Sequence, residues 1–131
     1  MTSKKKKTIL GIILAIVVLL ISFVGIMLLR MKKQLDKIDK TPVDVSQVAD
    51  GVYEGEYEAV LVKVKVQVTV SNGEIADVEL LKHDNGRGKP AEAMIEEMEK
   101  NNTAEVDAVS GATVSSEVIK AAVRDALRKG L

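Results

Sequence analysis

The feature that most constrains this chain is an uncharged run of 22 residues, from Thr8 to Leu29, dominated by Ile, Leu and Val. At about 1.5 Å per residue, a helix of this length measures roughly 33 Å, which is enough for a hydrocarbon core of about 30 Å. A cleavable signal peptide usually has a shorter apolar segment and a small-residue cleavage site, whereas Arg30-Met31-Lys32-Lys33 follows here. The sequence therefore predicts an uncleaved transmembrane helix at residues 8–29, held by the lipid bilayer, behind a basic tail at residues 1–7.

The net charge of zero conceals two halves of opposite sign. Residues 1–40 hold nine Lys and Arg against two Asp, whereas residues 41–131 hold ten Lys and Arg against seventeen Asp and Glu. The basic half suits a membrane surface, and the acidic half argues against nucleic-acid binding, which needs a basic footprint. Because basic residues flank the apolar run on both sides, the positive-inside rule does not decide its orientation.

The side-chain inventory excludes several kinds of chemistry. The chain has no Cys and one His, His83. Without thiolates it cannot form an iron–sulfur cluster or a Cys-ligated zinc site, and a single His cannot build a multi-His metal site. We therefore predict no metal ligands and assign no catalytic residue.

Periodicity behind the apolar run predicts a small antiparallel sheet. Residues 30–49 are expected as a juxtamembrane stalk and linker, and residues 50–131 as one folded domain. Valines at every even position of 60–70 predict a strand with one buried face, preceded by a strand over 53–59. Asn72-Gly73 suits a tight hairpin turn into a third strand at 75–81.

Two helical stripes and one connecting segment complete the domain. Apolar residues at helical spacing predict a helix that begins near Pro90 and ends near Asn101, and a second helix from about Val114 to Gly130. Residues 105–109 between them are expected as a short strand. The fold class is therefore α+β, with one N-terminal transmembrane helix followed by a small antiparallel-sheet domain with two packing helices.

The stretch Asp107-Ala108-Val109-Ser110-Gly111-Ala112-Thr113 directly precedes the last helix. Ser110 and Thr113 supply hydroxyls, Gly111 and Ala112 allow a phosphate to approach the backbone, and the helix N-terminus would direct free N–H groups at an anion. From the residues alone, the same turn can be an ordinary helix entry with side-chain capping. These residues are the candidate phosphate site.

The loop expected at residues 82–90 is a second candidate for ligand contact. Gly86 and Gly88 lie beside Arg87 and Lys89 and could present backbone N–H groups to an anion, although the spacing is not that of a P-loop. His83 could hydrogen-bond a cofactor, while a structural or solvated histidine is the ordinary interpretation.

The seven residues of 107–113 resemble the D-x-x-[ST]-G-A-[TS] signature of FMN-binding domains, found in flavin-carrying subunits of sodium-pumping NADH:quinone reductases and in small membrane-anchored flavoproteins. The resemblance covers about Asp50 to Gly130. It implies FMN joined to Thr113 by a phosphoester bond, after transfer from FAD by a separate Mg-dependent flavin transferase, with Asp107 shaping the recognised turn.

The same resemblance implies a biological setting. The protein would be an electron carrier more than a stand-alone enzyme, would exchange electrons with membrane redox partners or a quinone, and would hold its domain outside a bacterial cell membrane. Two other interpretations stay open at this point. One is a reductase that binds FMN without a covalent bond, and the other is an anchored interaction module without a ligand.

Overall fold

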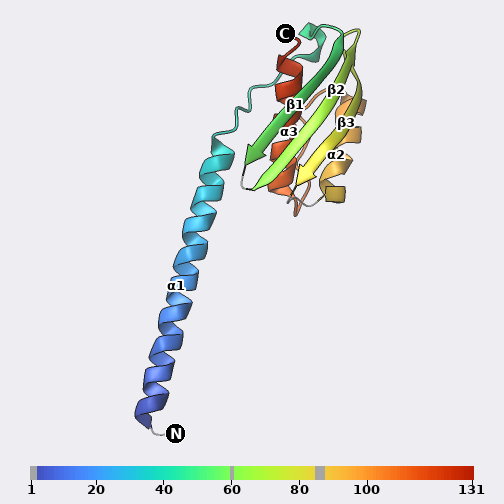
Figure 1. Ribbon diagram of the computed structural model, residues 1–131. Coiled ribbons are helices and arrows are strands. Elements are labelled where there is room, and N and C mark those ends of the chain that lie inside the picture. Colours follow the sequence, from blue (N-terminus) through green and yellow to red (C-terminus); the bar gives the residue numbers. More distant parts are fainter. Residues whose placement is uncertain (1–2, 60, 85–87) are drawn as a thin grey trace. The chain divides into compact units, whose positions relative to one another are not determined.

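The computed structural model describes residues 3–59, 61–84 and 88–131, with the backbone alone for 88–91 (Figure 1). The chain divides into two compact units, Met1–Gln34 and Leu35–Leu131. The first unit is helical, and the second contains the sheet, the remaining helices and the candidate site.

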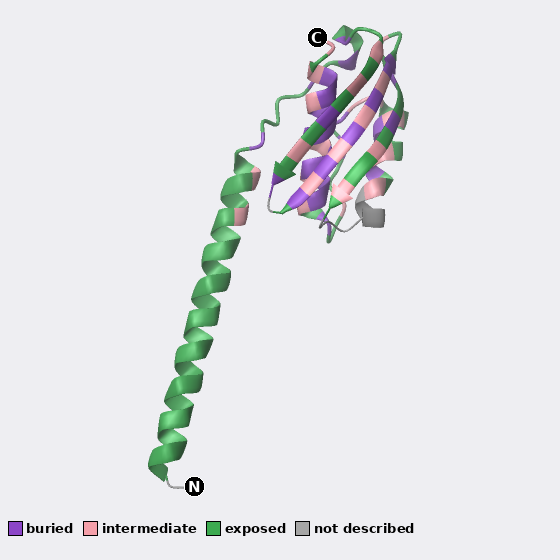
Figure 2. Cartoon of the chain, viewed as in Figure 1, coloured by how far each residue is buried: buried purple, intermediate pink, exposed green. Residues whose placement is uncertain are grey.

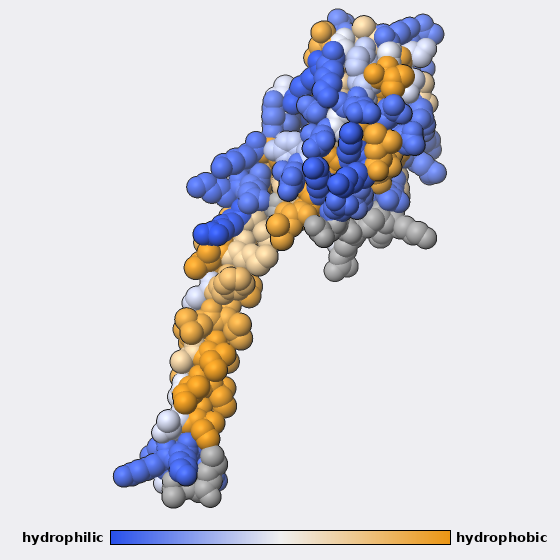
Figure 3. Space-filling model, viewed as in Figure 1, coloured by the Kyte–Doolittle hydropathy of each residue, from blue (hydrophilic) through white to orange (hydrophobic). Residues whose placement is uncertain are grey.

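Helix α1, Ser3–Asp36, is continuous and contains the whole uncharged run. Apolar side chains cover its middle part, with hydrophilic residues toward its ends (Figure 3). Its length and composition are those of a helix able to cross a membrane. The helix continues for about two turns beyond Leu29, as expected for the stalk, and ends ahead of Pro42.

The segment expected as a linker packs on the domain core. Asp44 caps a short 3-10 turn, η1 (Val45–Gln47), by accepting hydrogen bonds from the Ser46 N–H (3.0 Å) and the Ser46 hydroxyl (2.6 Å). Val43, Val45 and Val48 belong to the same buried cluster as the sheet. The polar residues and the proline of this segment suggested a linker, but its valines are stabilised by burial in the core.

Among the described residues, three antiparallel strands form one sheet in the order β1 (Gly51–Ala59), β2 (Val62–Ser71) and β3 (Glu74–Asp84). The even-numbered valines of β2 are 5% exposed or less, and Figure 2 shows the alternation of buried and intermediate residues along this strand. Asn72 and Gly73 both have positive φ, 54° and 73°, which is the conformation of a type I′ hairpin turn. The predicted strand pattern and hairpin are confirmed.

Helices α2 (Gly88–Asn101) and α3 (Thr113–Arg128) form the second layer. Helix α3 packs against β1 and β2, and α2 packs against β3. At Gly55 on β1, an added Cβ would lie 1.9 Å from the Ala122 carbonyl oxygen, so only glycine allows α3 to approach the sheet this closely. The α+β fold class, a sheet covered by two helices, is confirmed.

Helix α3 runs antiparallel to β1, which fixes where its N-terminus lies. The Ala49 N–H donates to the Gly130 carbonyl (2.9 Å), and Gly55 faces Ala122 and Ala126, so the start of α3 points toward the end of β1. Because β3 ends and α2 begins at this same end of the sheet, the two candidate stretches from the sequence lie at one end of the domain (Figure 1). We call it the motif end.

Side chains in the helices, or in the residue directly after a helix, bond backbone groups on both edges of the sheet. On β1, the Glu56 N–H donates to Asp125 Oδ2 (3.0 Å). On β3, the Ile75 N–H donates to Asn102 Oδ1 (2.6 Å). Two further bonds of this kind join Lys129 Nζ to the Glu54 carbonyl and the Val78 N–H to Glu99 Oε1.

Candidate functional site

The motif folds as a β-turn from Val109 to Ala112. The Ala112 N–H donates to the Val109 carbonyl (3.0 Å), and Gly111, the third residue of the turn, has a φ of +80°. Glycine at this position with positive φ is the requirement of a type II turn. A Cβ built on Gly111 would have nothing within 4 Å, so the glycine is required for its backbone conformation and the space in front of it is open.

The turn is attached to α3 by the hydroxyl of Ser116. Its Oγ accepts a hydrogen bond from the Val109 N–H (3.0 Å) and donates one to the Ala112 carbonyl (2.7 Å). Ser116 is completely buried. Ser116 was not predicted as part of the site, although a hydroxyl within the apolar stripe of the last helix, three residues after the motif, was a usable signal.

The hydroxyls around the turn differ sharply in exposure. In the fully described stretch 107–116, Ser110 and Thr113 are exposed, whereas Ser115 and Ser116 are buried. Thr113 is the first residue of α3, and Gly111 beside it is also exposed. The two hydroxyl-bearing residues that the motif predicted are therefore exposed, and the next two are buried.

The N-terminus of α3 has no side-chain cap within the described part of the chain. Ala112 occupies the N-cap position, and the first intrahelical bond runs from the Ser116 N–H to the Ala112 carbonyl (2.9 Å). The N–H groups of Thr113 and Val114 precede that bond and have no carbonyl partner within the helix. The described residues therefore do not show a side chain capping this helix entry, and the positive end of a 16-residue helix is directed at the turn.

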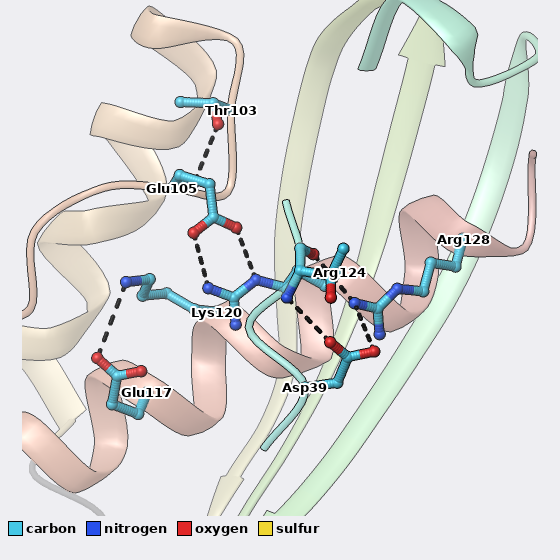
Figure 4. Close-up of polar contacts among 8 residues, drawn as sticks. Asp39, Thr103, Glu105, Glu117, Lys120, Arg124 and Arg128 are labelled. Carbon is cyan, nitrogen blue, oxygen red and sulfur yellow. Dashed lines mark hydrogen bonds and ion pairs between the residues drawn. The ribbon is translucent and has the colours of Figure 1, made fainter. Parts of the chain in front are cut away.

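The segment 105–109, which was expected as a strand, is not one. Bonds to side chains fix this segment, whereas a strand would be fixed by backbone hydrogen bonds to a neighbouring strand. Arg124 of α3 makes two bonds to the Glu105 carboxylate, from Nε to Oε1 (2.6 Å) and from Nη2 to Oε2 (2.8 Å), and Thr103 Oγ1 accepts from the Glu105 N–H (3.0 Å) (Figure 4). This arrangement fixes the chain just before the motif to the helix just after it.

The ion pair is strongly asymmetric in burial. The Arg124 side chain is 1% exposed and the Glu105 side chain 30% exposed. The hydrogen bonds from Arg124 lower the pKa of Glu105, against the opposing effect of burial. The same bonds raise the pKa of Arg124. No sequence pattern connects the two residues, because they are brought together only by the fold.

Asp107, the first residue of the motif, is exposed and borders a cavity of about 240 Å³ between its own segment and α2. Its expected role in shaping the turn stays a prediction. The cavity is lined by Ala93, Met94, Glu97, Asp107, Ala108 and Val109.

The second candidate stretch lies partly outside the described residues. His83 belongs to β3, which continues to Asp84, so the loop expected from residue 82 begins later. His83 pairs with Val64 at the motif end, and both of its ring nitrogens are buried without a hydrogen-bond partner in the described parts of the chain. Gly88 is the first residue of α2, and Gly86 lies outside the described residues.

The described residues thus form a two-layer α+β domain with exposed Ser110 and Thr113 at a helix N-terminus, an arrangement found in domains that bind phosphorylated ligands. The family model for the FMN-binding domain matches residues 62–128, just over half of the chain. The chain therefore belongs to the FMN-binding domain family. The match begins with β2 and ends with the last residue of α3, so it includes the whole motif. No curated protein matches the chain.

Proposed function

We propose that this protein is a membrane-anchored electron carrier whose FMN is joined to Thr113 through a phosphoester bond. The observation that carries the proposal is the placement of Thr113 within a matched FMN-binding domain. Its hydroxyl is on an exposed residue at the first position of α3, directly after a glycine turn and at a helix N-terminus without a side-chain cap.

The residues at the motif end fit a flavin phosphate. The N–H groups of Thr113 and Val114, which have no carbonyl partner within the helix, and the open space at Gly111 suit an anion, and the exposed Ser110 carries a hydroxyl that can donate a further hydrogen bond. The ring nitrogens of His83, which have no partner among the described residues, suit a polar ring atom, because buried polar groups are normally hydrogen-bonded. FMN supplies one- and two-electron redox chemistry, and the protein supplies its attachment and environment.

Attachment makes Thr113 the nucleophile of a phosphoryl transfer catalysed by a separate flavin transferase. The Thr113 oxygen bonds to the flavin-side phosphorus of FAD, and the bond from that phosphorus to the bridging pyrophosphate oxygen breaks. AMP leaves with that oxygen, and the hydroxyl proton passes to a base of the transferase. The reaction is redox-neutral, and Thr113 needs only an accessible hydroxyl.

The surroundings favour a flavin that can exchange electrons with other molecules. Of the two tyrosines in the chain, Tyr53 donates to the Ala49 carbonyl (2.6 Å) near the C-terminus of α3, at the end of the domain opposite the motif. Tyr57 on β1 is therefore the tyrosine nearer to the motif. With so few aromatic rings the flavin is not sandwiched, so membrane redox partners or a quinone are the proposed exchange partners, at the outer face of the membrane.

The test is the intact mass of the full-length protein co-produced with a flavin transferase. Wild type and Thr113→Ser should gain the FMN-phosphoryl group, and Thr113→Val, which is similar in shape but has no hydroxyl, should not. Ser110→Ala should still gain it, because Ser110 contributes a hydrogen bond of only about 0.5 to 1.5 kcal/mol. An adduct on Thr113→Val would show that Thr113 is not the acceptor.

Visible absorbance after denaturation separates the proposal from its two alternatives. A covalently bound flavin stays with the denatured chain, and a non-covalent flavin is released and can be separated from the chain. A ligand-free interaction module would show no flavin in either fraction, even with a competent transferase present.

A further inference from the structure

We propose that Ser116 is a positioning residue for FMN attachment, a role that rests on the proposed function of Thr113. The inference comes from the hydrogen bonds of one buried hydroxyl, which join both ends of the motif turn to the helix that begins with the acceptor. Ser116 itself touches neither the flavin nor the reacting oxygen in this proposal.

The hydroxyl closes a ring of hydrogen bonds around the turn. Val109 N–H donates to Ser116 Oγ (3.0 Å), Ser116 Oγ donates to the Ala112 carbonyl (2.7 Å), and Ala112 N–H donates back to the Val109 carbonyl (3.0 Å). Val109 and Ala112 are the first and last residues of the type II turn. One side chain therefore fixes both ends of the turn to the rigid first turn of α3.

Ser116 makes one more hydrogen bond than a serine inside a helix usually makes. A bond from a serine hydroxyl to the carbonyl four residues earlier is common in helices and says little by itself. Here the same oxygen also accepts from Val109, seven residues earlier and outside the helix. Because Ser116 is 0% exposed, water does not compete with these bonds, and a low local dielectric strengthens them.

The consequence for attachment follows from where Thr113 lies. It is the next residue after Ala112, so the direction of its hydroxyl depends on the geometry of the turn. Gly111 makes that turn possible but also leaves it flexible, because glycine has many accessible backbone conformations. Without the Ser116 bonds, the hydroxyl would be presented in a range of orientations, and fewer encounters with the transferase would be productive.

The experiment measures initial rates of FMN attachment to full-length protein in detergent micelles, with purified flavin transferase, FAD and Mg²⁺. Ser116→Ala should lower kcat/KM for the acceptor protein about tenfold, while the adduct that forms still maps to Thr113. Ser116→Thr keeps the hydroxyl but adds a methyl group in a packed site, so it should lose stability and retain most of the rate.

Val48→Ala is the control for lost stability. Val48 is buried in the same core but lies near Gly130, at the end of the domain away from the motif. It should lower the unfolding midpoint without slowing attachment. Hydrogen exchange at the Val109 amide should become faster in Ser116→Ala and stay protected in Ser116→Thr.

Two results would overturn the proposal. One is a folded Ser116→Ala protein that gains FMN at the wild-type rate, and the other is a Ser116→Thr protein that is as slow as Ser116→Ala. If Ser116→Ala does not fold, Ser116→Cys takes its place, because a thiol has nearly the same shape but forms weaker hydrogen bonds. At equal stability Ser116→Cys should gain FMN more slowly than Val48→Ala, and equal rates overturn the proposal. A wild-type protein that never gains FMN, or gains it elsewhere, contradicts the proposed function instead.

Discussion

The ion pair between Glu105 and Arg124 allows a quantitative test of how the motif is held. Its two members differ in burial, with 1% of the arginine side chain and 30% of the glutamate side chain exposed. We expect the two single substitutions to have unequal effects on stability. Glu105→Ala leaves a guanidinium inside the protein without its carboxylate, whereas Arg124→Met leaves a carboxylate that water can reach.

The magnitude follows from the cost of an unpaired buried charge. Removing one partner of a buried ion pair typically destabilises a protein by about 3 to 5 kcal/mol. Because Glu105 lies at the rim, water can enter when it is removed, and we expect the lower end, about 3 kcal/mol. For Arg124→Met, where methionine refills most of the volume, we expect about 1 kcal/mol, since charged groups near the surface rehydrate and surface pairs contribute little.

Urea unfolding of the full-length protein in detergent micelles measures both values. Tyrosine fluorescence reports the domain, because both tyrosines of the chain, Tyr53 and Tyr57, lie in β1 and the chain has no Trp. The folded-state pKa of Glu105 is lowered from its ordinary 4.5. The ionised Glu105 therefore contributes its full share to the free energy of unfolding above pH 4.5, and this share is lost as the pH falls through the lowered pKa. The stability difference between wild type and Glu105→Gln should be constant at neutral pH and shrink below about pH 4.5.

The opposite order of stability losses in the two variants would contradict this explanation. If Arg124→Met destabilises the domain as much as Glu105→Ala, the burial of the guanidinium is not what sets the energetics of the pair. A difference between wild type and Glu105→Gln that grows on acidification would contradict the sign of the pKa shift.

Three further predictions concern packing, the turn and topology. Gly55→Ala should destabilise the domain by at least about 3 kcal/mol, because the added Cβ would meet the backbone of α3. The urea midpoint should fall, and an unchanged midpoint would contradict the close approach of α3 to β1. In the mass assay Gly111→Asn should keep FMN attachment and Gly111→Val should lose it, because Asn tolerates the positive φ of this position and Val does not. Equal amounts of adduct on the two variants would show that the positive φ is not required. The protein should resist high-salt extraction from membranes, and external protease on intact cells should remove residues 50–131; digestion only after lysis would reverse the proposed orientation.

Elements defined by local periodicity could be predicted from the sequence. The alternating valines of β2 and the apolar stripes of α2 and α3 record burial within a short window, and the Asn72-Gly73 pair records the positive φ of a tight turn. All of these patterns match the structure.

Elements held by distant partners could not be predicted in this way. The segment 105–109 has the composition of a strand, but its bonds go to Arg124 and Ser116 and not to a neighbouring strand. The valines of 43–48 lacked a regular period, so their burial appeared only with the fold. The motif residues were found by resemblance, whereas the residues that hold the motif in place were found from contacts.

The bonded strand edges would matter for a domain that is anchored in a bilayer, as proposed for this protein. Anchored copies diffuse in a plane with a common orientation, so identical domains meet far more often than they would in free solution. A sheet edge with free N–H and C=O groups would then act as a template for joining one copy to the next. In this domain Asp125 and Lys129 bond backbone groups of one edge strand, and Asn102 and Glu99 bond those of the other, which would disfavour sheet extension between anchored copies.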